Sequence, residues 1–232
     1  MFTKERFVVF LDIMGFKERV ARNTHDSLYA ELTIFNREVT DIIGTYNEIA
    51  NIPERLEKEV SDTALKGADK DTNKIFLAQF SDSIVIFSSG NTKNDLKIIS
   101  NVAKDIMKKA IEMENPIPLK GALAEGVITC VDSKSLFFGQ ALIDAYLLEE
   151  NIQYYGIVVH HSAEQSVRKY ANDSNVFVEQ LVRLKSGKIK HYELAWYKDS
   201  PAAIKDSLNK VRLSVSDSPR KYIDNTEEII ED

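Results

Sequence analysis

Residues 7–16 read FVVFLDIMGF, an apolar run that ends at an acidic residue and a nearby glycine. Valine and phenylalanine are common in strands, and a short continuous apolar run is typical of a buried strand. Glycine in this position favours a sharp change of chain direction. The stretch therefore predicts a buried strand that continues through Leu11, with Asp12 at its end and a tight turn at Gly15.

A second acidic residue, Asp82, lies between two apolar runs. Residues 75–80 (IFLAQF) and 84–87 (IVIF) flank Ser81, Asp82 and Ser83, which predicts a β-hairpin with Asp82 at its tip. Paired strands would bring this tip to the same edge of a sheet as Asp12. Carboxylate oxygens are the ligands that Mg²⁺ and Mn²⁺ prefer, usually one or two of them, with phosphates and water completing the shell.

A carboxylate at the end of an apolar strand is unfavourable unless something compensates its charge. Asp12 and Asp82 are therefore the residue types that a site for divalent metal ions and a nucleoside triphosphate needs, and the rest of the sequence decides how much weight this pair carries. The alternative is structural, because Asp residues at strand ends and Asp-Ser pairs also form ordinary turns.

The remaining pattern alternates helices with strands, and we expect a single sheet covered by helices on one face. Apolar spacing predicts helices over residues 25–50, 93–114, 140–151 and 201–213, the second of them capped by Thr92 or Asn94. Apolar and β-branched runs predict strands over residues 119–131, 155–159, 176–184 and 189–196. We expect one domain over residues 1–200 with a surface insertion at 51–73, followed by a C-terminal helix and acidic tail at 201–232. The final residues, 227–232, are expected to fray.

Composition excludes several classes of protein. The chain has 232 residues, of which 44% are hydrophobic, so it can bury a sizeable core. A formal net charge of −6 argues against nucleic acid as a partner, because such binding depends on Lys and Arg. The single cysteine, Cys130, allows no internal disulfide. The apolar run near the N-terminus is too short for a signal peptide or a membrane span, so we expect a cytoplasmic protein that does not bind membranes.

The two acidic motifs resemble those of class III nucleotidyl cyclases. Residues 10–16 are similar to the first metal-binding strand and turn of that family, and residues 80–82 (FSD) to the hairpin that bears the second metal aspartate. Further matches follow in the same order along the chain: residues 121–126 (GALAEG), Phe138-Gly139, Leu148-Glu149 and residues 184–187 (LKSG). The resemblance covers roughly residues 6–197, and it rests on the order of the motifs more than on any one of them.

This resemblance implies a ferredoxin-like α+β fold (class α/β), with a mainly antiparallel sheet, helices on one face, and a head-to-tail homodimer. It implies that Asp12, Asp82 and the backbone carbonyl of Ile13 bind the metal, with Asp12 and Asp82 as the catalytic residues. The reaction would be attack of the ribose 3′-oxygen on the α-phosphate, releasing pyrophosphate. Lys185 falls where the family has a phosphate-contacting lysine.

Four positions depart from the purine cyclases. Ala78 and Leu136 stand at the two positions where purine cyclases have residues that read the base. Ile143 and Leu147 stand at the two positions where those enzymes have residues that stabilise the transition state. A more specific resemblance is to the bacterial pyrimidine cyclases of Pycsar antiphage defence. It is carried by residues 138–149 (FGQALIDAYLLE), Gln153, Gly156-Ile157, residues 184–187, Tyr192 and Trp196.

That resemblance implies conversion of UTP, or alternatively CTP, to its 3′,5′-cyclic monophosphate with Mn²⁺ as cofactor and Mg²⁺ as the alternative metal. The uridylate activity is favoured over the cytidylate activity. The product would activate a separate effector protein. Two other interpretations stay open: a purine cyclase with altered base recognition, and a catalytically inactive nucleotide-binding or regulatory module.

Four further residues are candidates for contacting the substrate. Lys120 begins the strand at residues 119–131, and its position suits either the triphosphate or solvent. Tyr146 is placed to stack on a base or to pack as a helix aromatic. Lys185 and Lys188 lie in a turn, where lysines are also common as solvated residues, so their phosphate role rests mainly on the resemblance.

Overall fold

The computed structural model describes residues 2–50, 74–131, 136–170, 175–216 and 218–231. The insertion expected at residues 51–73 lies outside the described part of the chain. The strands are β1 Phe2–Ile13, β2 Ile75–Phe80, β3 Ser83–Ser88, β4 Leu119–Val131, β5 Leu136–Phe138, β6 Ile157–Val159, β7 Phe177–Leu184 and β8 Gly187–Leu194. The helices are α1 Phe16–Arg22, α2 His25–Ala50, α4 Lys93–Glu112, α5 Gln140–Glu149, α6 His161–Tyr170, α7 Pro201–Ser214 and α8 Ser218–Glu231.

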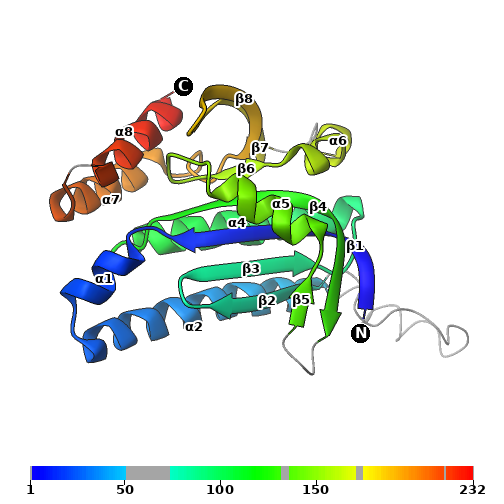
Figure 1. The fold of residues 1–232 in the computed structure, drawn as a ribbon, viewed down its shortest axis with the longest axis horizontal. Helices are drawn as coiled ribbons and strands as arrows, with labels where there is room; N and C mark the ends of the chain where they lie inside the picture. Colours follow the sequence, from blue (N-terminus) through cyan, green and yellow to red (C-terminus); the bar gives the residue numbers. More distant parts are fainter. Residues whose placement is uncertain (1, 51–73, 132–135, 171–174, 217, 232) are drawn as a thin grey trace, which may run out of the picture.

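All the described strands belong to one sheet, with the order β2-β3-β1-β4-β6-β8-β7 and β5 paired to β4 (Figure 1). Neighbouring strands are antiparallel except β4 and β6, which are parallel. This confirms the expected mainly antiparallel sheet. Strand β1 lies between β3 and β4, so its C-terminal residues have a hydrogen-bonded neighbour on each side.

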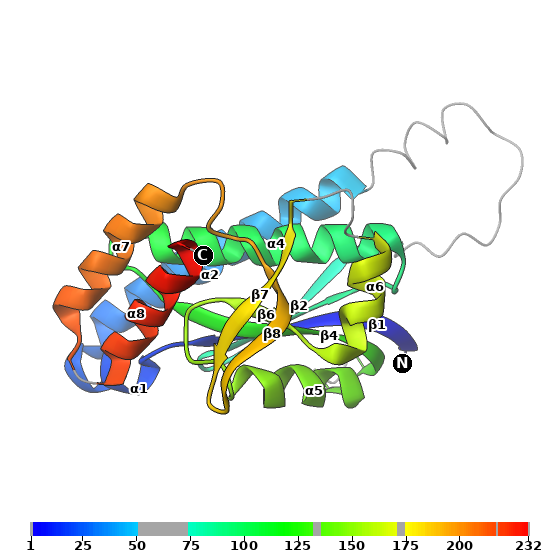
Figure 2. The same ribbon diagram turned by 90° about the horizontal axis from the view of Figure 1, so that it is seen from above.

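Helices cover both faces of this sheet, which differs from the one-sided cover that we expected. Phe7, Val9 and Leu11 belong to the large core that includes α2 and α4. The alternate residues Val8 and Phe10 pack instead near Ala141 and Ala145 of α5. Figure 2 shows α2 and α4 on one side of the sheet and α5 on the other. Successive side chains of a strand point to opposite faces, so a run apolar at every position needs cover on both.

The expected start of the helix at residues 93–114 is confirmed. Thr92 accepts a hydrogen bond from the backbone N–H of Asp95 at 3.2 Å, and the Asp95 side chain accepts one from the backbone N–H of Thr92 at 3.0 Å. This reciprocal pair satisfies two of the helix's otherwise unpaired N–H groups. Helix α4 then runs to Glu112, two residues short of the expected end.

The expectation of a frayed acidic end was wrong. Residues 218–231 form helix α8, in which Ile223, Thr226 and Ile229 are buried. These residues recur at every third position, so they form one buried, mainly apolar stripe among charged neighbours. The acidic residues lie on the other faces of the helix. Because the segment is rich in charged residues, the stripe was not recognised from the sequence. Helix α6 was also not predicted, although Ala163 and Val167 bury a similar one-sided face.

Candidate active site

Asp12 lies at the C-terminal end of β1, with a residue of interest on each side. It pairs with Ser83 on β3 and with Lys120 on β4. The backbone N–H of Ile13 donates to the carbonyl oxygen of Asp82 at 3.0 Å, which ties the β2–β3 turn to the end of β1. Asp12 and Asp82, far apart in the chain, are thus neighbours at one edge of the sheet.

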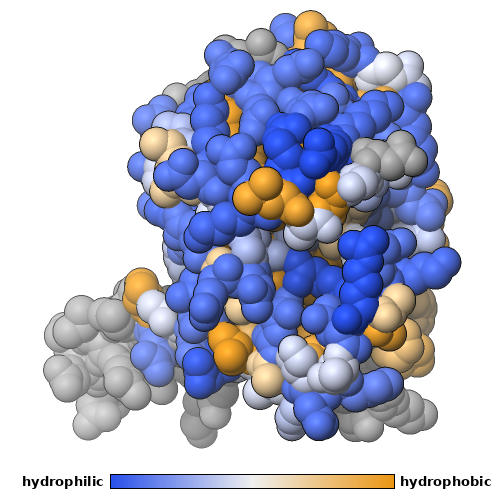
Figure 3. Space-filling view, turned by 90° about the vertical axis from the view of Figure 1, so that its left-hand side faces the viewer, coloured by the Kyte–Doolittle hydropathy of each residue, from blue (hydrophilic) through white to orange (hydrophobic). Residues whose placement is uncertain are grey.

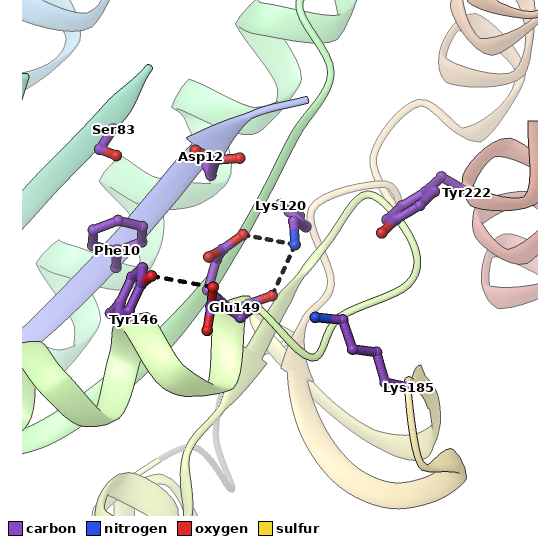
Figure 4. Close-up of a pocket in the computed structure, with 9 residues that line it drawn as sticks. Phe10, Asp12, Ser83, Lys120, Tyr146, Glu149, Lys185 and Tyr222 are labelled. Atoms are coloured by element: carbon purple, nitrogen blue, oxygen red, sulfur yellow. Dashed lines mark hydrogen bonds and ion pairs between the residues drawn. The ribbon is translucent and has the colours of Figure 1, made fainter. Parts of the chain in front are cut away.

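A cavity of about 280 Å³ opens beside Asp12. Its lining comes from β1, β3, β4, α5, the β7–β8 turn and α8, namely Phe10, Asp12, Ser83, Lys120, Tyr146, Glu149, Glu150, Lys185 and Tyr222. Figure 4 shows Ser83, Phe10 and Tyr146 on one side, Tyr222 and Lys185 on the other, and Lys120 and Glu149 between them. The end of the molecule that carries α1, α7 and α8 is mostly hydrophilic (Figure 3).

A buried ion pair forms the centre of the cavity wall. The Nζ atom of Lys120 lies 2.8 Å from Oε1 of Glu149 and 3.1 Å from the backbone carbonyl oxygen of the same residue. Both side chains are buried. Burial raises the pKa of Glu149, and the Lys120 ammonium opposes that rise. Lys120 therefore compensates the carboxylate of Glu149. Less of the positive charge of Lys120 is left to attract a bound ligand.

The electrostatics at Asp12 favour a cation. Burial raises the pKa of Asp12 to about 7, with the negative charges of Glu149 and Asp82 adding to the rise and Lys120 acting in the opposite direction. The cavity lining holds three carboxyl groups, from Asp12, Glu149 and Glu150, but only two amino groups. A triphosphate would add several negative charges to this excess, so additional cations are needed for it to bind.

The donor set fits a divalent metal ion bound by two carboxylates. Within the described residues, no group of three or more His, Cys, Asp or Glu side chains is placed to hold a metal. Asp12 lines the cavity and Asp82 is close enough for its charge to act on Asp12, so these two residues would supply the carboxylates of the shell, with backbone, water and substrate oxygens completing it. Mg²⁺ and Mn²⁺ at triphosphate sites accept this arrangement, whereas zinc sites need three or four protein ligands.

The structure brings most of the predicted site residues together. Asp12, Lys120, Tyr146 and Lys185 line the cavity. Asp82 and Ile13 are not among the lining residues; a backbone hydrogen bond joins them next to Asp12. Lys188 does not line it, and its Nζ atom lies 3.0 Å from Glu228 on α8. The hydroxyl of Tyr146 donates to Glu150 at 3.1 Å, and its ring meets that of Phe10 edge-on at 5.5 Å.

Sequence reasoning missed Tyr222, which reaches the cavity from α8. This segment was expected to be part of a helix with an acidic tail, beyond the motifs that resemble the cyclase family. Glu149 entered the sequence analysis only as part of a motif match, and its pairing with Lys120 depends on a contact between residues 29 positions apart. An aromatic residue next to the apolar stripe of a C-terminal amphipathic helix is the one sequence signal that points to Tyr222.

Comparisons with known proteins found solved structures of similar fold but no match by sequence. No family model matches the chain, and no curated protein matches it. Among solved structures, the chain is similar to the guanylate cyclase domain of RhGC from Catenaria anguillulae in complex with GTP, with 16% identity, 84% of this chain and 98% of that chain covered, and a TM-score of 0.57.

Two other structures show the same likeness. The catalytic core of a rhodopsin-guanylyl cyclase with converted specificity, in complex with ATPαS, has 16% identity over 84% of this chain and 98% of that chain, with a TM-score of 0.59. A bacterial light-regulated adenylyl cyclase has 13% identity over 89% of this chain and 100% of that chain, with a TM-score of 0.53. No helix in the described residues is long and apolar enough to cross a membrane. The chain has the fold of the class III adenylyl and guanylyl cyclase domains.

Proposed function

We propose that this chain is a nucleotidyl cyclase, which converts a nucleoside triphosphate to its 3′,5′-cyclic monophosphate and pyrophosphate. The observation that carries the proposal is the placement of Asp12 at the end of β1, beside the Asp82 turn and in one cavity with Lys120 and Lys185. Two carboxylates whose negative charges oppose each other are suited to divalent cations, and the lysines are suited to phosphate oxygens.

In the reaction, the ribose 3′-oxygen forms a bond to the α-phosphorus, and the bond from that phosphorus to the oxygen bridging to the β-phosphate breaks. The 3′-hydroxyl proton passes to solvent water. Asp12, Asp82 and the Ile13 carbonyl would hold Mn²⁺, or Mg²⁺ as the alternative. When bound, the metal would lower the pKa of the attacking hydroxyl and neutralise charge on the leaving pyrophosphate. Lys185 holds the phosphate chain, and Tyr146 with Phe10 offers an aromatic surface to the base.

We further propose a pyrimidine substrate, with UTP favoured over CTP. The support is the resemblance to the Pycsar pyrimidine cyclases and the apolar residues Ala78 and Leu136 at the purine-reading positions. In that setting the cyclic nucleotide would activate a separate effector protein in antiphage defence. A purine substrate would require other residues to read the base.

The proposed enzyme acts as a homodimer, and α5 supports this. Ala141 and Ala145 pack against the sheet, while Ile143, Tyr146 and Leu147 are 50%, 43% and 51% exposed on the same helix. A group of neighbouring large apolar side chains exposed on one helix is normally covered by a partner. A second copy of this chain is the occupant that the cyclase resemblance implies.

The dimer is testable by replacing one outward leucine. Leu147→Glu is expected to reduce the mass measured by light scattering from that of a dimer to that of a monomer, because a charge would be buried at the contact. The matched control is Leu213→Glu, at an 87% exposed leucine on α7, which should remain a dimer. A wild-type protein that is monomeric at all concentrations would contradict the homodimer.

The reaction is tested by incubating the purified protein with Mn²⁺ and each of ATP, GTP, CTP and UTP, with cyclic monophosphates measured by mass spectrometry. Asp82→Ala serves as the control. We expect cyclic UMP from the wild-type protein and none from the variant. Cyclic CMP would support a pyrimidine substrate but with cytosine in place of uracil as the base. Cyclic AMP or GMP would contradict the pyrimidine proposal. No product from any of the four would favour the inactive nucleotide-binding module.

A further inference from the structure

Helix α8 reaches the cavity through a single side chain, Tyr222, whose position is determined by its neighbours. The ring stacks on that of Tyr155, with centroids 6.1 Å apart and planes at 22°. The hydroxyl oxygen accepts a hydrogen bond from Nε2 of Gln153 at 3.0 Å. Among the described residues, the hydroxyl hydrogen has no acceptor, so it is available to a ligand in the cavity.

Two polar side chains anchor the helix at the same place. The side-chain amide of Asn225 donates to the carbonyl oxygen of Gln153 at 2.6 Å, and the hydroxyl of Thr226 accepts from the backbone N–H of Tyr155 at 2.9 Å. Ile223 and Ile229 are fully or almost fully buried beneath it. Tyr222 is therefore presented by a helix held through both its polar neighbours and its core side, which gives the side chain little freedom to move.

The same helix also holds the turn that carries Lys185. Glu228 lies 3.0 Å from Nη2 of Arg183 and 3.0 Å from Nζ of Lys188, the residues on either side of the β7–β8 turn. The backbone N–H of Lys185 donates to the carbonyl oxygen of Asn151 at 2.8 Å. Glu228 thus engages Lys188, while Lys185 is the lysine that lines the cavity.

The two ends of the cavity differ in chemistry. Phe10 and Tyr146 form an aromatic side, while Tyr222 and Lys185 lie together on the opposite side (Figure 4). Lys120, between them, already has Glu149 as a partner. The side formed by Tyr222 and Lys185 thus combines a neutral hydroxyl donor with an ammonium group, a pairing suited to phosphate oxygens.

We propose that α8 forms the phosphate-binding wall of the nucleotide cavity, in which the Tyr222 hydroxyl donates a hydrogen bond to the triphosphate and Glu228 positions the turn that carries Lys185. The inference rests on the proposed function for the identity of the ligand. It adds a binding residue and a positioning residue from a segment that lies outside the motifs resembling the cyclase family.

The first test measures binding of the phosphate chain without base or ribose. Isothermal titration with inorganic tripolyphosphate in the presence of Mn²⁺ is expected to show about 10-fold weaker binding for Tyr222→Phe, since a hydrogen bond to a charged group is lost and the ring is kept. Tyr29→Phe is the matched control, because Tyr29 is 74% exposed on α2 and does not line the cavity. Equal affinities for the wild-type protein and Tyr222→Phe would overturn the role of the hydroxyl.

The second test separates substrate binding from chemistry. With UTP, Tyr222→Phe and Glu228→Gln are each expected to raise KM by about 5–10-fold and to change kcat by less than about 2-fold, as for lost binding that is equal in ground and transition states. Glu231→Gln is the control for Glu228, since Glu231 lies on the same helix and pairs with Lys205 of α7 at 2.8 Å, away from the β7–β8 turn. A Glu228→Gln variant with unchanged KM would overturn the positioning role.

A double variant tests whether Glu228 affects phosphate binding through Lys185. If Glu228 acts through Lys185, the double variant Glu228→Gln with Lys185→Ala should bind tripolyphosphate no more weakly than Lys185→Ala alone. Additive losses would overturn this route. A wild-type protein that binds Mn²⁺-tripolyphosphate with the expected dependence on Tyr222, yet forms no cyclic nucleotide, would overturn the cyclase reaction and support the phosphate wall.

Discussion

Replacement of Asp12 by Asn is expected to abolish cyclisation and to make the metal-free protein more stable at pH 8. Under the proposed metal binding by Asp12 and Asp82, loss of one of the two carboxylates removes several kcal/mol of transition-state stabilisation, which corresponds to a fall in kcat/KM of about 10³-fold or more. The stabilisation follows from the environment of Asp12, since its burial and the charges of Glu149 and Asp82 make its ionised form unfavourable.

The direction of the pH dependence follows from the raised pKa of Asp12. The pKa is about 7 in the folded protein against an ordinary value of 3.8, so the folded state binds the proton more tightly than the unfolded state. The contribution of Asp12 to stability is thus fully present below about pH 4 and is lost as the pH rises through about 7. The Asp12→Asn variant would carry no such loss. Because Asp12 is only partly buried, we expect a modest gain in melting temperature of about 2–4 °C at pH 8.

The measurement is thermal unfolding of both proteins with a chelator from pH 4 to pH 8, followed by addition of Mn²⁺. Above pH 7, Mn²⁺ should raise the melting temperature of the wild-type protein and have little effect on Asp12→Asn, because a ligand stabilises only the state that binds it. Asp82→Asn should lose activity to a similar extent. Retention of more than about a tenth of wild-type activity by Asp12→Asn would contradict its role as a metal ligand.

Replacement of Gly121 by Ala is expected to lower the free energy of unfolding by about 3 kcal/mol or more. A Cβ atom at this position would lie 2.3 Å from the carbonyl oxygen of Phe10 and 2.5 Å from Cδ2 of Leu11. The nearest group belongs to the backbone of β1, so relief requires the two central strands to move apart. The displaced residues adjoin Asp12, so activity should fall as well.

Melting temperature is the direct measure of this effect, with an expected decrease of about 6–12 °C for a chain of this size. Gly44→Ala is the matched control. Gly44 lies in α2, where an added Cβ atom would meet nothing within 4 Å, and alanine is the better helix former, so a gain of about 0.5–1 kcal/mol is expected there. A Gly121→Ala protein that melts within about 2 °C of the wild type would show that the β1–β4 pair is looser than its geometry indicates.

Strands and helices with strong local signals were predicted well. The expected strand at residues 119–131 coincides with β4, and the hairpin that flanks Asp82 has the expected strands on each side. These segments are apolar runs bounded by proline or by polar turn residues, so local pattern and tertiary environment agree. The cover of both sheet faces was missed, although β1 is apolar at every position from Phe7 to Leu11.

The side-chain partners within the candidate site could not be predicted from the sequence. Lys185 and Lys188 are equivalent in sequence, since both belong to the same expected turn of polar residues. The structure separates them because Glu228 of α8 engages Lys188, while Lys185 lines the cavity. Lys120 likewise suited solvent and phosphate equally in the sequence, and the structure gives it a third role as the partner of Glu149.

The sequence by itself determined that a buried strand ends in Asp12, that a hairpin presents Asp82, and that amphipathic helices pack against one sheet. Each of these follows from the spacing of neighbouring residues, which local backbone geometry converts directly into a buried and an exposed face. Only the tertiary structure decided that α8 joins the cavity, that Glu149 pairs with Lys120, and that Glu228 engages Lys188. The two ion pairs join residues 29 and 40 positions apart, and they depend on helix rotation and packing, which no local pattern specifies.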